Sequence, residues 1–471
     1  MNTPVVDFVR RYAQQRTTRM HMPGHKGRGP LGCEELDITE IAGADELYEA
    51  EGIIAQSEAN ATQLFGTART YYSTEGSSQC IRAMLHLALQ MRPAKAGRPV
   101  LLAARNAHKA LLYAAALLDF DIQWLWPAPD AAGALCTCPV EPEVLASALD
   151  ELSAEGRTPF GVYLTSPDYL GFVQDVAGLS AVCHAHGLPL LVDNAHGAYL
   201  HFLKEGGRHP IQLGADLCCD SAHKTLPVLT GGAYLHLGTS VQADEAAVRN
   251  ALALFGSTSP SYLILQSLDA ANAVLADGFR EKLDICRWRL GMLCRELDAL
   301  RPGLALPLTG AHREPLKLTL DAAVLGLSGQ QLAQALRERG VECEYADPRY
   351  IVLMPSAESS AAEFACLQTA LHAICGEAPA ADVSVTADDP AAFAALAGAL
   401  EAQPRRFTIR EAVLAPQEMI PAAEAVGRIC AAPAVSCPPA IPIVVSGETV
   451  PPEALPLFAR YGIEKAAVVK E

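Results

Sequence analysis

Short apolar runs alternate with amphipathic segments from about residue 58 onward, and this alternation restricts the fold more than any other feature of the chain. Runs such as "RPVLLAA", "FGVYLT", "LPLLVD" and "ADLCCD" have the composition of buried strands. Between them, "SSQCIRAMLHLALQM" places Ile81, Met84 and Leu85 on one face of a helix, with Ser77 or Ser78 as its N-cap. Strands that alternate with helices form βαβ units, so the sequence predicts an α/β fold with a mostly parallel sheet.

Polar clusters follow the apolar runs where each predicted strand ends. They are Gly76–Ser78, Asn106–His108, Ser166–Asp168, Asp193–His196 and Ser221–Lys224. In parallel sheets, ligands bind beyond the carboxyl ends of the strands. The sequence therefore predicts one cofactor site at this edge of the sheet.

The composition excludes several classes of protein. Hydrophobic residues make up 50% of the chain and charged residues 19%, which is typical of a folded protein with a large core. At roughly 150 residues per domain, 471 residues correspond to two or three domains. A net charge of −17 argues against a nucleic-acid surface and suits a cationic small substrate.

The sequence also predicts a cytoplasmic protein without a metal site. The N-terminal segment "MNTPVVDFVRRYAQQRTTRM" contains no apolar region of a secretory signal, and no run of about 18 apolar residues could span a membrane. The 14 cysteines are scattered, and the close pairs Cys136/Cys138 and Cys218/Cys219 lack a zinc-binding spacing. We expect reduced, mostly buried thiols.

Lys224 is the most informative single residue, because a lysine at the end of a buried strand is costly to desolvate. One interpretation is a lysine whose long chain carries its amine to solvent. The other is a reactive amine that binds an aldehyde covalently. Asp193, at the end of another strand, favours the second, since pyridoxal phosphate needs an acid beside its pyridine nitrogen. The "EGSSQ" helix start and Ser221 offer donors for a phosphate, and His108 is either a ring-stacking residue or an ordinary turn histidine.

Other motifs are weaker. There is no G-x-x-x-x-G-K-[ST] sequence and no G-x-S-x-G sequence. His184 and His186 in "HAHG" are two apart on a predicted helix and do not share a face, so we interpret them as packing or surface residues. The "MHMPGHKG" segment is either a flexible arm or an arm that folds over a site.

Eight segments together resemble a known family. They are "MHMPGHKGRG", "DITEIAGADELY", "EGIIAQSEANATQLFG", "RNAHKA", "YLTSPDYLG", "LLVDNAHGA", "SAHKTLPVLTGGAYLH" and "STSPSYLILQSLDA". In this order they resemble the pyridoxal-phosphate-dependent ornithine/lysine/arginine decarboxylases of the aspartate-aminotransferase fold. The tail from "FTIREAVLAPQEM" to "IPIVVSGE" is similar to the C-terminal domain of that family. The resemblance covers nearly the whole chain and implies a short-form member of fold type I, with a seven-stranded sheet between helices.

The resemblance implies roles for the predicted site residues. Lys224 would bind the cofactor covalently, with His223 beside the reacting carbon. Asp193 would pair with the pyridine nitrogen, while Ala195 and His108 would pack on the two faces of the ring. His196 would lie near the ring's phenolic oxygen, and the phosphate would be held by Gly76, Ser77, Ser78 and Ser221. Thr258 and Ser259 would approach the site from a second subunit. Glu448 would be an acid near the distal end of the substrate.

The chain departs from the family pattern at three places. The family usually has N-G-T or N-G-S where this chain has Glu75-Gly76-Ser77, and D-E-A-H where position 194 is Asn. The tail motif Y-P-P-G-I-P is here Cys437-Pro438-Pro439-Ala440-Ile441-Pro442. An acid at position 75 would repel a phosphate unless its side chain turns away or pairs with a base.

The resemblance also implies an organisation and a reaction. We expect an N-terminal arm at 1–50, a cofactor-binding large domain at 51–295, a small α+β domain at 296–400 and the family's C-terminal domain at 401–471. The expected reaction is α-decarboxylation of arginine, lysine or ornithine to the amine and CO2, feeding polyamine metabolism. The alternatives are another reaction of the same cofactor, such as transamination or elimination, and a catalytically silent regulatory paralogue. A homodimer or higher homo-oligomer is expected, with no nucleic-acid or membrane partner.

Overall fold

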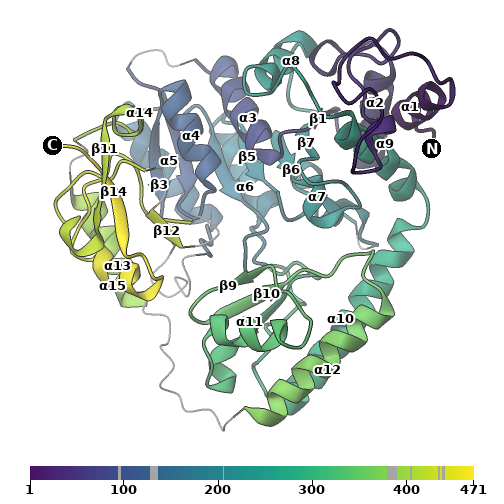
Figure 1. Cartoon of the computed structure of the whole chain (residues 1–471). Helices are drawn as coiled ribbons and strands as arrows, with labels where there is room; N and C mark the ends of the chain where they lie inside the picture. The colour runs from purple at the N-terminus through teal and green to yellow at the C-terminus, as the bar shows by residue number, and fades with distance from the viewer. Residues whose placement is uncertain are drawn as a thin grey trace. The chain divides into compact units, whose positions relative to one another are not determined.

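The computed structural model describes residues 1–93, 97–127, 136–204, 206–378, 390–403, 406–432, 435–437 and 441–471 (Figure 1). The chain divides into two compact units. The first comprises Met1–Pro93 and Val176–Asp284, and the second comprises Ala94–Asp175 and Ile285–Glu471. No helix within the described residues has the length and apolar character needed to cross a membrane.

The largest sheet has seven strands in the order β1-β7-β6-β5-β4-β2-β3. The first unit contributes β1 (Arg69–Ser73), β7 (Ala233–Leu237), β6 (Leu217–Asp220) and β5 (Leu190–Asp193), and the second contributes β4 (Val162–Thr165), β2 (Val100–Ala104) and β3 (Asp121–Leu125). The pairs β5–β6, β2–β3 and β2–β4 are parallel, while β7 runs antiparallel to both β1 and β6. The predicted α/β fold with a mostly parallel seven-stranded sheet is confirmed.

Helices of the first unit surround its four strands. They are α1 (Pro4–Gln14), α2 (Ile53–Phe65), α3 (Ser77–Met91), α6 (Val176–Ala185), α7 (Ala222–Thr225), α8 (Glu245–Ala253) and α9 (Tyr262–Ala276). Helix α3 packs against β5, β6 and β7 through an apolar face that includes Ile81, Met84 and Leu85, as its spacing predicts.

The prediction of an extended N-terminal arm is wrong for residues 4–14. These residues form α1, which packs against α2 and α9 and buries Val5, Val6 and Val9. The carboxylate of Asp269 on α9 accepts the N–H groups of Val5 and Val6, both at 2.9 Å, and so satisfies two donors at the start of the helix.

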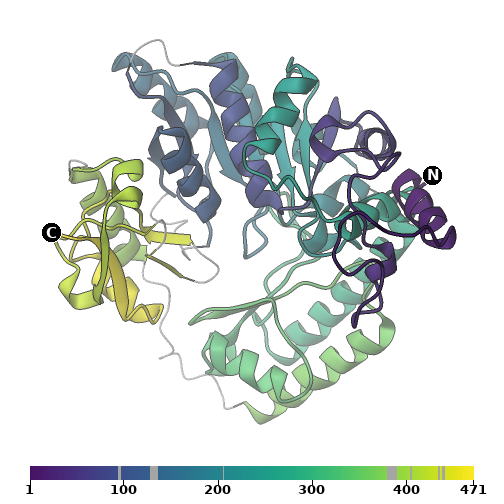
Figure 2. The same ribbon diagram turned by 45° about the horizontal axis from the view of Figure 1, so that its top comes forward.

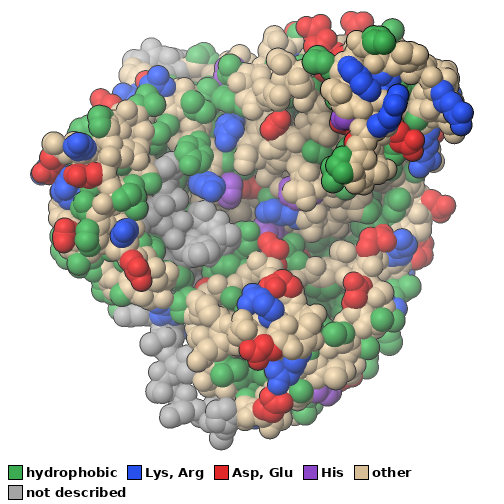
Figure 3. Space-filling model, in the orientation of Figure 1, with side chains coloured by type: hydrophobic (Ala, Val, Ile, Leu, Met, Phe, Trp, Pro, Cys, Tyr) green, Lys and Arg blue, Asp and Glu red, His purple; other side chains and the backbone are tan. Residues whose placement is uncertain are grey.

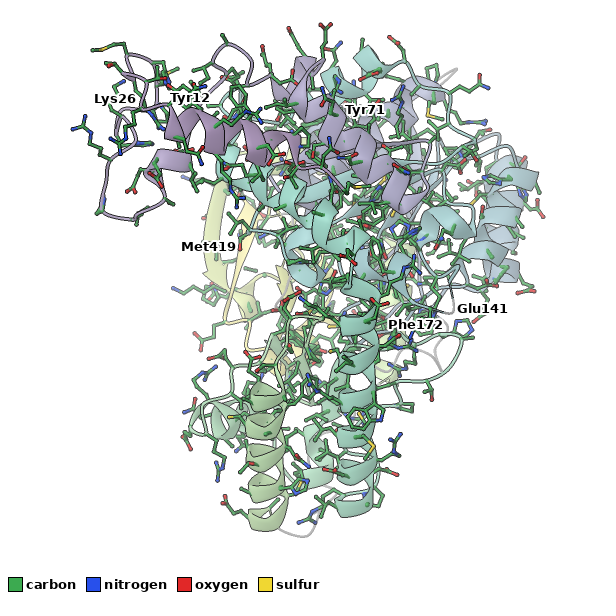
Figure 4. All side chains as sticks on the ribbon, turned by 90° about the vertical axis from the view of Figure 1, so that its right-hand side faces the viewer. Tyr12, Lys26, Tyr71, Glu141, Phe172 and Met419 are labelled. Carbon is green, nitrogen blue, oxygen red and sulfur yellow. The ribbon has the colours of Figure 1, made fainter. Side chains whose placement is uncertain are left out.

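The loop after α1 forms side-chain hydrogen bonds with α1 and with residues that follow the loop. Figure 4 shows Tyr12 on α1 and Lys26 on this loop. The Tyr12 hydroxyl lies 2.6 Å from Nε2 of His21, and His25 Nε2 lies 3.2 Å from the Asp37 carboxylate. The "MHMPGHKG" segment is therefore a folded loop in this unit.

Basic side chains gather over this N-terminal segment on the face shown in Figure 3, whereas acidic and basic side chains are interspersed over the rest of that face. The segment itself is rich in arginine, with Arg10, Arg11, Arg16 and Arg19 close in sequence.

The second unit adds three smaller sheets to β4, β2 and β3. They are the antiparallel sheet β8 (Leu318–Asp321), β10 (Tyr350–Leu353), β9 (Tyr345–Ala346), the pair β11 (Gln417–Pro421) and β14 (Lys465–Val469), and the pair β12 (Val435–Cys437) and β13 (Ile441–Val444). Its helices are α4 (Lys109–Leu118), α5 (Pro142–Ala154), α11 (Gly329–Arg337), α12 (Ala361–Glu377), α13 (Pro390–Ala402), α14 (Ile409–Leu414) and α15 (Ala454–Arg460).

Helix α10 (Phe279–Leu300) is continuous across residue 295, where we expected the large domain to end. Figures 1 and 2 show it side by side with α12, and Gln368 of α12 donates a hydrogen bond to Glu296 of α10. The predicted boundary therefore falls inside a helix. The departure at Ala440 lies outside the described residues.

Candidate active site

Lys224 lies on α7, a single helical turn directly after the buried strand β6. Its side chain is half-buried, and Nζ lies 2.9 Å from Nε2 of His196. A lysine ammonium can only donate, so Nε2 of His196 accepts this hydrogen bond when Lys224 is charged. The amine of Lys224 therefore lies against the imidazole of His196 and does not extend into open solvent.

The turn after β5 presents the second predicted group, Asp193. This residue ends the strand, is 2% exposed, and its Oδ1 accepts the N–H of Ala195 at 3.1 Å and the thiol of Cys219 at 3.7 Å. The same turn carries His196, which is also buried. One short segment therefore positions both the predicted partner of the pyridine nitrogen and the partner of Lys224.

The start of α3 forms a site suited to a phosphate. The structure places Gly76, not Ser77 or Ser78, at the N-cap; its φ is 70° and no side chain caps the helix. A Cβ at Gly76 would meet no atom within 4 Å, and Ser221 donates a hydrogen bond to Ser77 at 2.8 Å. An uncapped N-terminus of a 15-residue helix with two adjacent hydroxyls favours an anion.

Glu75, the first departure from the family pattern, directly precedes this helix start. Its side chain is exposed, while its N–H donates to Oγ of Ser73 at 3.1 Å. Water and salt screen an exposed carboxylate, so the repulsion that Glu75 exerts on a phosphate is weaker than that of a buried acid.

His223 has a fixed ring orientation. Nδ1 donates to the carbonyl of Gly232 at 3.0 Å, and the backbone N–H of His223 is bonded to the same oxygen at 3.2 Å. With the proton on Nδ1, Nε2 of the neutral ring is the atom that can accept a proton.

Three other predicted site residues are His108, Thr258 and Ser259, and their contacts are local. His108 is the N-cap of α4 in the second unit, where Nδ1 accepts the N–H of Ala110 at 3.2 Å. Thr258 and Ser259 are exposed in the loop before α9. Their contacts with a cofactor stay predictions.

Glu448 has a strong partner within the second unit. Its two carboxylate oxygens accept Nη1 and Nη2 of Arg105 at 2.8 and 2.9 Å, and Oε2 also accepts the N–H of Val445 at 2.8 Å. The guanidinium carbon lies 4.8 and 4.7 Å from the ring centroids of Trp124 and Trp126. Sequence reasoning missed Arg105, and no local signal could have found it, because the pair is separated by 343 residues.

A second buried acid, Asp220 at the end of β6, was also missed. His209, His236 and Asn194 donate to its carboxylate, and Cys218 lies 3.7 Å away. Burial opposes ionisation of Asp220, but the two histidines lower its pKa below the ordinary value.

His209, Cys218 and Asp220 are close enough to hold a metal ion, but their protonation favours hydrogen bonds. Nδ1 of His209 accepts the N–H of Ile211 at 3.4 Å, so its proton is on Nε2 and faces Asp220. Burial raises the pKa of the Cys218 thiol well above its usual range.

The residues of the first unit fit pyridoxal phosphate. Lys224 supplies an amine, Asp193 a buried carboxylate, and the start of α3 with Ser77 and Ser221 an anion site. This fold and this set of groups define an enzyme of PLP fold type I, with pyridoxal phosphate as the expected cofactor.

Comparison with known proteins identifies the family. Residues 3–286 match the family model described as Orn/Lys/Arg decarboxylase, major domain, and the chain belongs to this family of amino-acid decarboxylases.

The chain is similar to two curated proteins of Bacillus subtilis over nearly its full length. It is 28% identical to the uncharacterized protein YaaO, covering 98% of this chain and 94% of the relative. It is 26% identical to an arginine decarboxylase, covering 96% of this chain and 92% of the relative. The constitutive lysine decarboxylase of Escherichia coli has a similar fold, with a TM-score of 0.75 and 20% identity over 99% of this chain and 80% of that one.

Proposed function

We propose that this protein removes the α-carboxylate of a basic amino acid as CO2 and releases the amine, with arginine as the first candidate substrate. The observation that carries the proposal is the arrangement in the first unit, where Lys224 Nζ lies 2.9 Å from His196 on the same turn that begins with the buried Asp193. Relatives that match 95% or more of this chain include arginine decarboxylases, such as that of Bacillus subtilis, whereas the match to the constitutive lysine decarboxylase of Escherichia coli covers 56% of it; this supports arginine over lysine or ornithine.

Each residue has a defined task in this proposal. When bound, pyridoxal phosphate supplies the electron sink for the bond broken at the α-carbon. The carboxylate of Asp193 favours a proton on the pyridine nitrogen, and the Ser77 and Ser221 hydroxyls with the start of α3 hold the phosphate. Either Nε2 of His223 or Nζ of Lys224 is the atom that returns a proton to the α-carbon.

The finer roles carried by the family resemblance belong to the same proposal. His108 and Ala195 pack on the ring, His196 lies near its phenolic oxygen, and Thr258 with Ser259 approaches from a second subunit of a homodimer. We further propose a cytoplasmic location, since the cysteines whose side chains the structure describes are free thiols, and a role in supplying polyamines.

A substrate panel tests the proposal. The purified protein with pyridoxal phosphate is incubated with arginine, lysine, ornithine and, as a neutral control, glutamine, while CO2 and product are quantified. We expect equal amounts of CO2 and amine, with arginine used fastest. A keto acid product would identify an aminotransferase, and a protein that never acquires a borohydride-sensitive absorbance band would be the silent paralogue.

Two lysine variants complete the test. Lys224→Ala should lose both the band and turnover, because the amine that binds the cofactor is gone. Lys470→Ala removes an exposed lysine near the C-terminus and should behave as the wild type.

A further inference from the structure

Asp220 is fully buried, and both of its carboxylate oxygens are occupied by hydrogen-bond donors. Oδ1 accepts Nδ2 of Asn194 at 2.6 Å, and Oδ2 accepts Nε2 of His209 at 3.0 Å and Nε2 of His236 at 3.1 Å. Asp220 ends β6, His236 lies on β7, and Asn194 lies in the turn after β5. His209 directly precedes a short 3-10 helix at Pro210–Leu213. Burying a carboxylate costs free energy unless several donors surround it. If the side chain at this strand end served only to fill space, an apolar residue would do so without that cost.

The buried thiols and the phenol around Asp220 stay protonated, so they do not compete with it as charged acceptors. Cys80 on α3 and Tyr234 on β7 are close enough to be affected by its charge, and burial raises the pKa of both, to about 12 for Cys80. Burial also raises the pKa of the Cys218 thiol.

Asn194 connects this cluster to the candidate active site. Its backbone N–H donates to the carbonyl of Cys219 at 2.9 Å, and its own carbonyl accepts the N–H of Gly197 at 2.8 Å. Both its backbone and its side chain are therefore bound to the end of β6. The turn that it anchors begins after Asp193 and carries His196, whose Nε2 lies 2.9 Å from Lys224.

We propose that Asp220, acting through Asn194, is a positioning residue that holds the 193–197 turn in place, so that His196 meets Lys224 and Asp193 keeps its orientation. The proposal rests on the proposed function, since it concerns how the same cofactor site is held. His209 and His236 hold the carboxylate, and the Asn194 amide is the link that reaches the site.

Four variants separate this positioning role from simple stabilisation. Asn194→Ala removes the link and leaves the Asp220 charge. Asp220→Asn removes the carboxylate charge that the three donors surround, and its NH2 group pairs with Asn194 only if the Asn194 amide turns its Oδ1 toward it. The double variant Asn194→Asp/Asp220→Asn restores the pairing, because the carboxylate introduced at position 194 accepts from the new amide and the amide oxygen accepts from the histidines. Thr70→Val is the matched control, since it removes the 2.8 Å hydrogen bond to Nδ1 of His236 on the far side of the cluster.

Three measurements are made on each variant: the affinity for pyridoxal phosphate by absorbance titration, the pH midpoint of the lysine-bound cofactor band, and the thermal unfolding of the cofactor-free protein. We expect Asn194→Ala and Asp220→Asn to bind the cofactor about tenfold more weakly, the factor that loss of a hydrogen bond to a charged group produces. Both should also shift the pH midpoint of the band. The double variant should recover the affinity to within about threefold, on the same scale. Thr70→Val should unfold at a lower temperature yet keep the wild-type affinity and midpoint.

The positioning role is refuted if Asn194→Ala and Asp220→Asn unfold more easily but bind the cofactor as the wild type does, or if the double variant regains stability without affinity. A wild-type protein that shows no cofactor band at all would instead refute the proposed function. The two failures are therefore distinguishable.

Discussion

Replacing Glu448 with glutamine should destabilise the second unit, because the pair that Glu448 forms with Arg105 is buried. The two side chains are 7% and 2% exposed, and the guanidinium is enclosed by Trp124 and Trp126. In Glu448→Gln, one carboxylate oxygen becomes an NH2 group that faces the guanidinium donors, and the positive charge loses its counter-ion.

Removal of one partner from a buried ion pair costs about 3–5 kcal/mol, since the remaining charge is left uncompensated. In the variant, the indole rings of Trp124 and Trp126 still stabilise the Arg105 guanidinium, since a desolvated cation–π contact provides roughly 2 kcal/mol. We therefore expect a loss in unfolding free energy near the lower end of the range, about 3 kcal/mol.

Urea unfolding followed by tryptophan fluorescence measures this loss in the correct unit, because the chain has 3 tryptophans, at positions 124, 126 and 288, all in the second unit. Glu464→Gln is the matched control, since that side chain is exposed, and its unfolding midpoint should stay close to wild type. An unchanged midpoint for Glu448→Gln, together with a raised KM for arginine, would refute the structural interpretation and make Glu448 a substrate-binding acid.

Three further predictions concern the first unit. Lys224→Ala should abolish the borohydride-sensitive band and CO2 release, and a variant that retains both would exclude Lys224 as the cofactor-binding lysine. Asp269→Ala leaves the N–H groups of Val5 and Val6 without their acceptor, so α1 should detach at a cost of about 1–3 kcal/mol and residues 1–16 should be cleaved faster by trypsin. Burial lowers the pKa of His201 from 6.5 to about 4, so the folded state resists a proton that the unfolded chain accepts, and stability falls as the pH drops from about 6.5 toward 4. His201→Gln should lose less stability over this window in thermal scans, and equal losses would contradict the assignment.

The sheet and the central residues of the site could be predicted from the sequence because their signals are local. Each parallel strand is a short apolar run followed by polar residues, so the sequence predicts Asp193 at the end of one strand and Lys224 shortly after another, and the structure has them at the end of β5 and on the turn after β6. Helix α1 also has a local signal that the Gly- and Pro-rich segment after it obscured. Val5, Val6 and Val9 follow Pro4 at the spacing of one helix face.

The buried pairs could not be predicted in this way. Arg105 and Glu448 meet across 343 residues, and each looks like an ordinary charged residue in its own segment. Asp220 is bonded to His209, 11 residues before it, and to His236, 16 residues after it, and the three residues do not share one helix or strand. Such contacts can be predicted only when the arrangement of the strands and loops in the folded chain is known.

Asp220 offers a physical reason for asparagine at position 194, where the family resemblance leads us to expect the glutamate of a D-E-A-H pattern. Asn194 Nδ2 lies 2.6 Å from Oδ1 of Asp220, and a glutamate at position 194 would bring a second carboxylate against the buried one without a proton between them. Asparagine therefore suits this chain because position 220 is an acid. We expect family members that keep the glutamate to have a hydrogen-bond donor, not a carboxylate, at the position of Asp220. In this chain, Asn194→Glu should weaken folding and cofactor affinity, while Asn194→Glu/Asp220→Gln should recover both, as thermal unfolding and absorbance titration can measure. A relative that carries both acids and binds the cofactor normally would contradict the coupling.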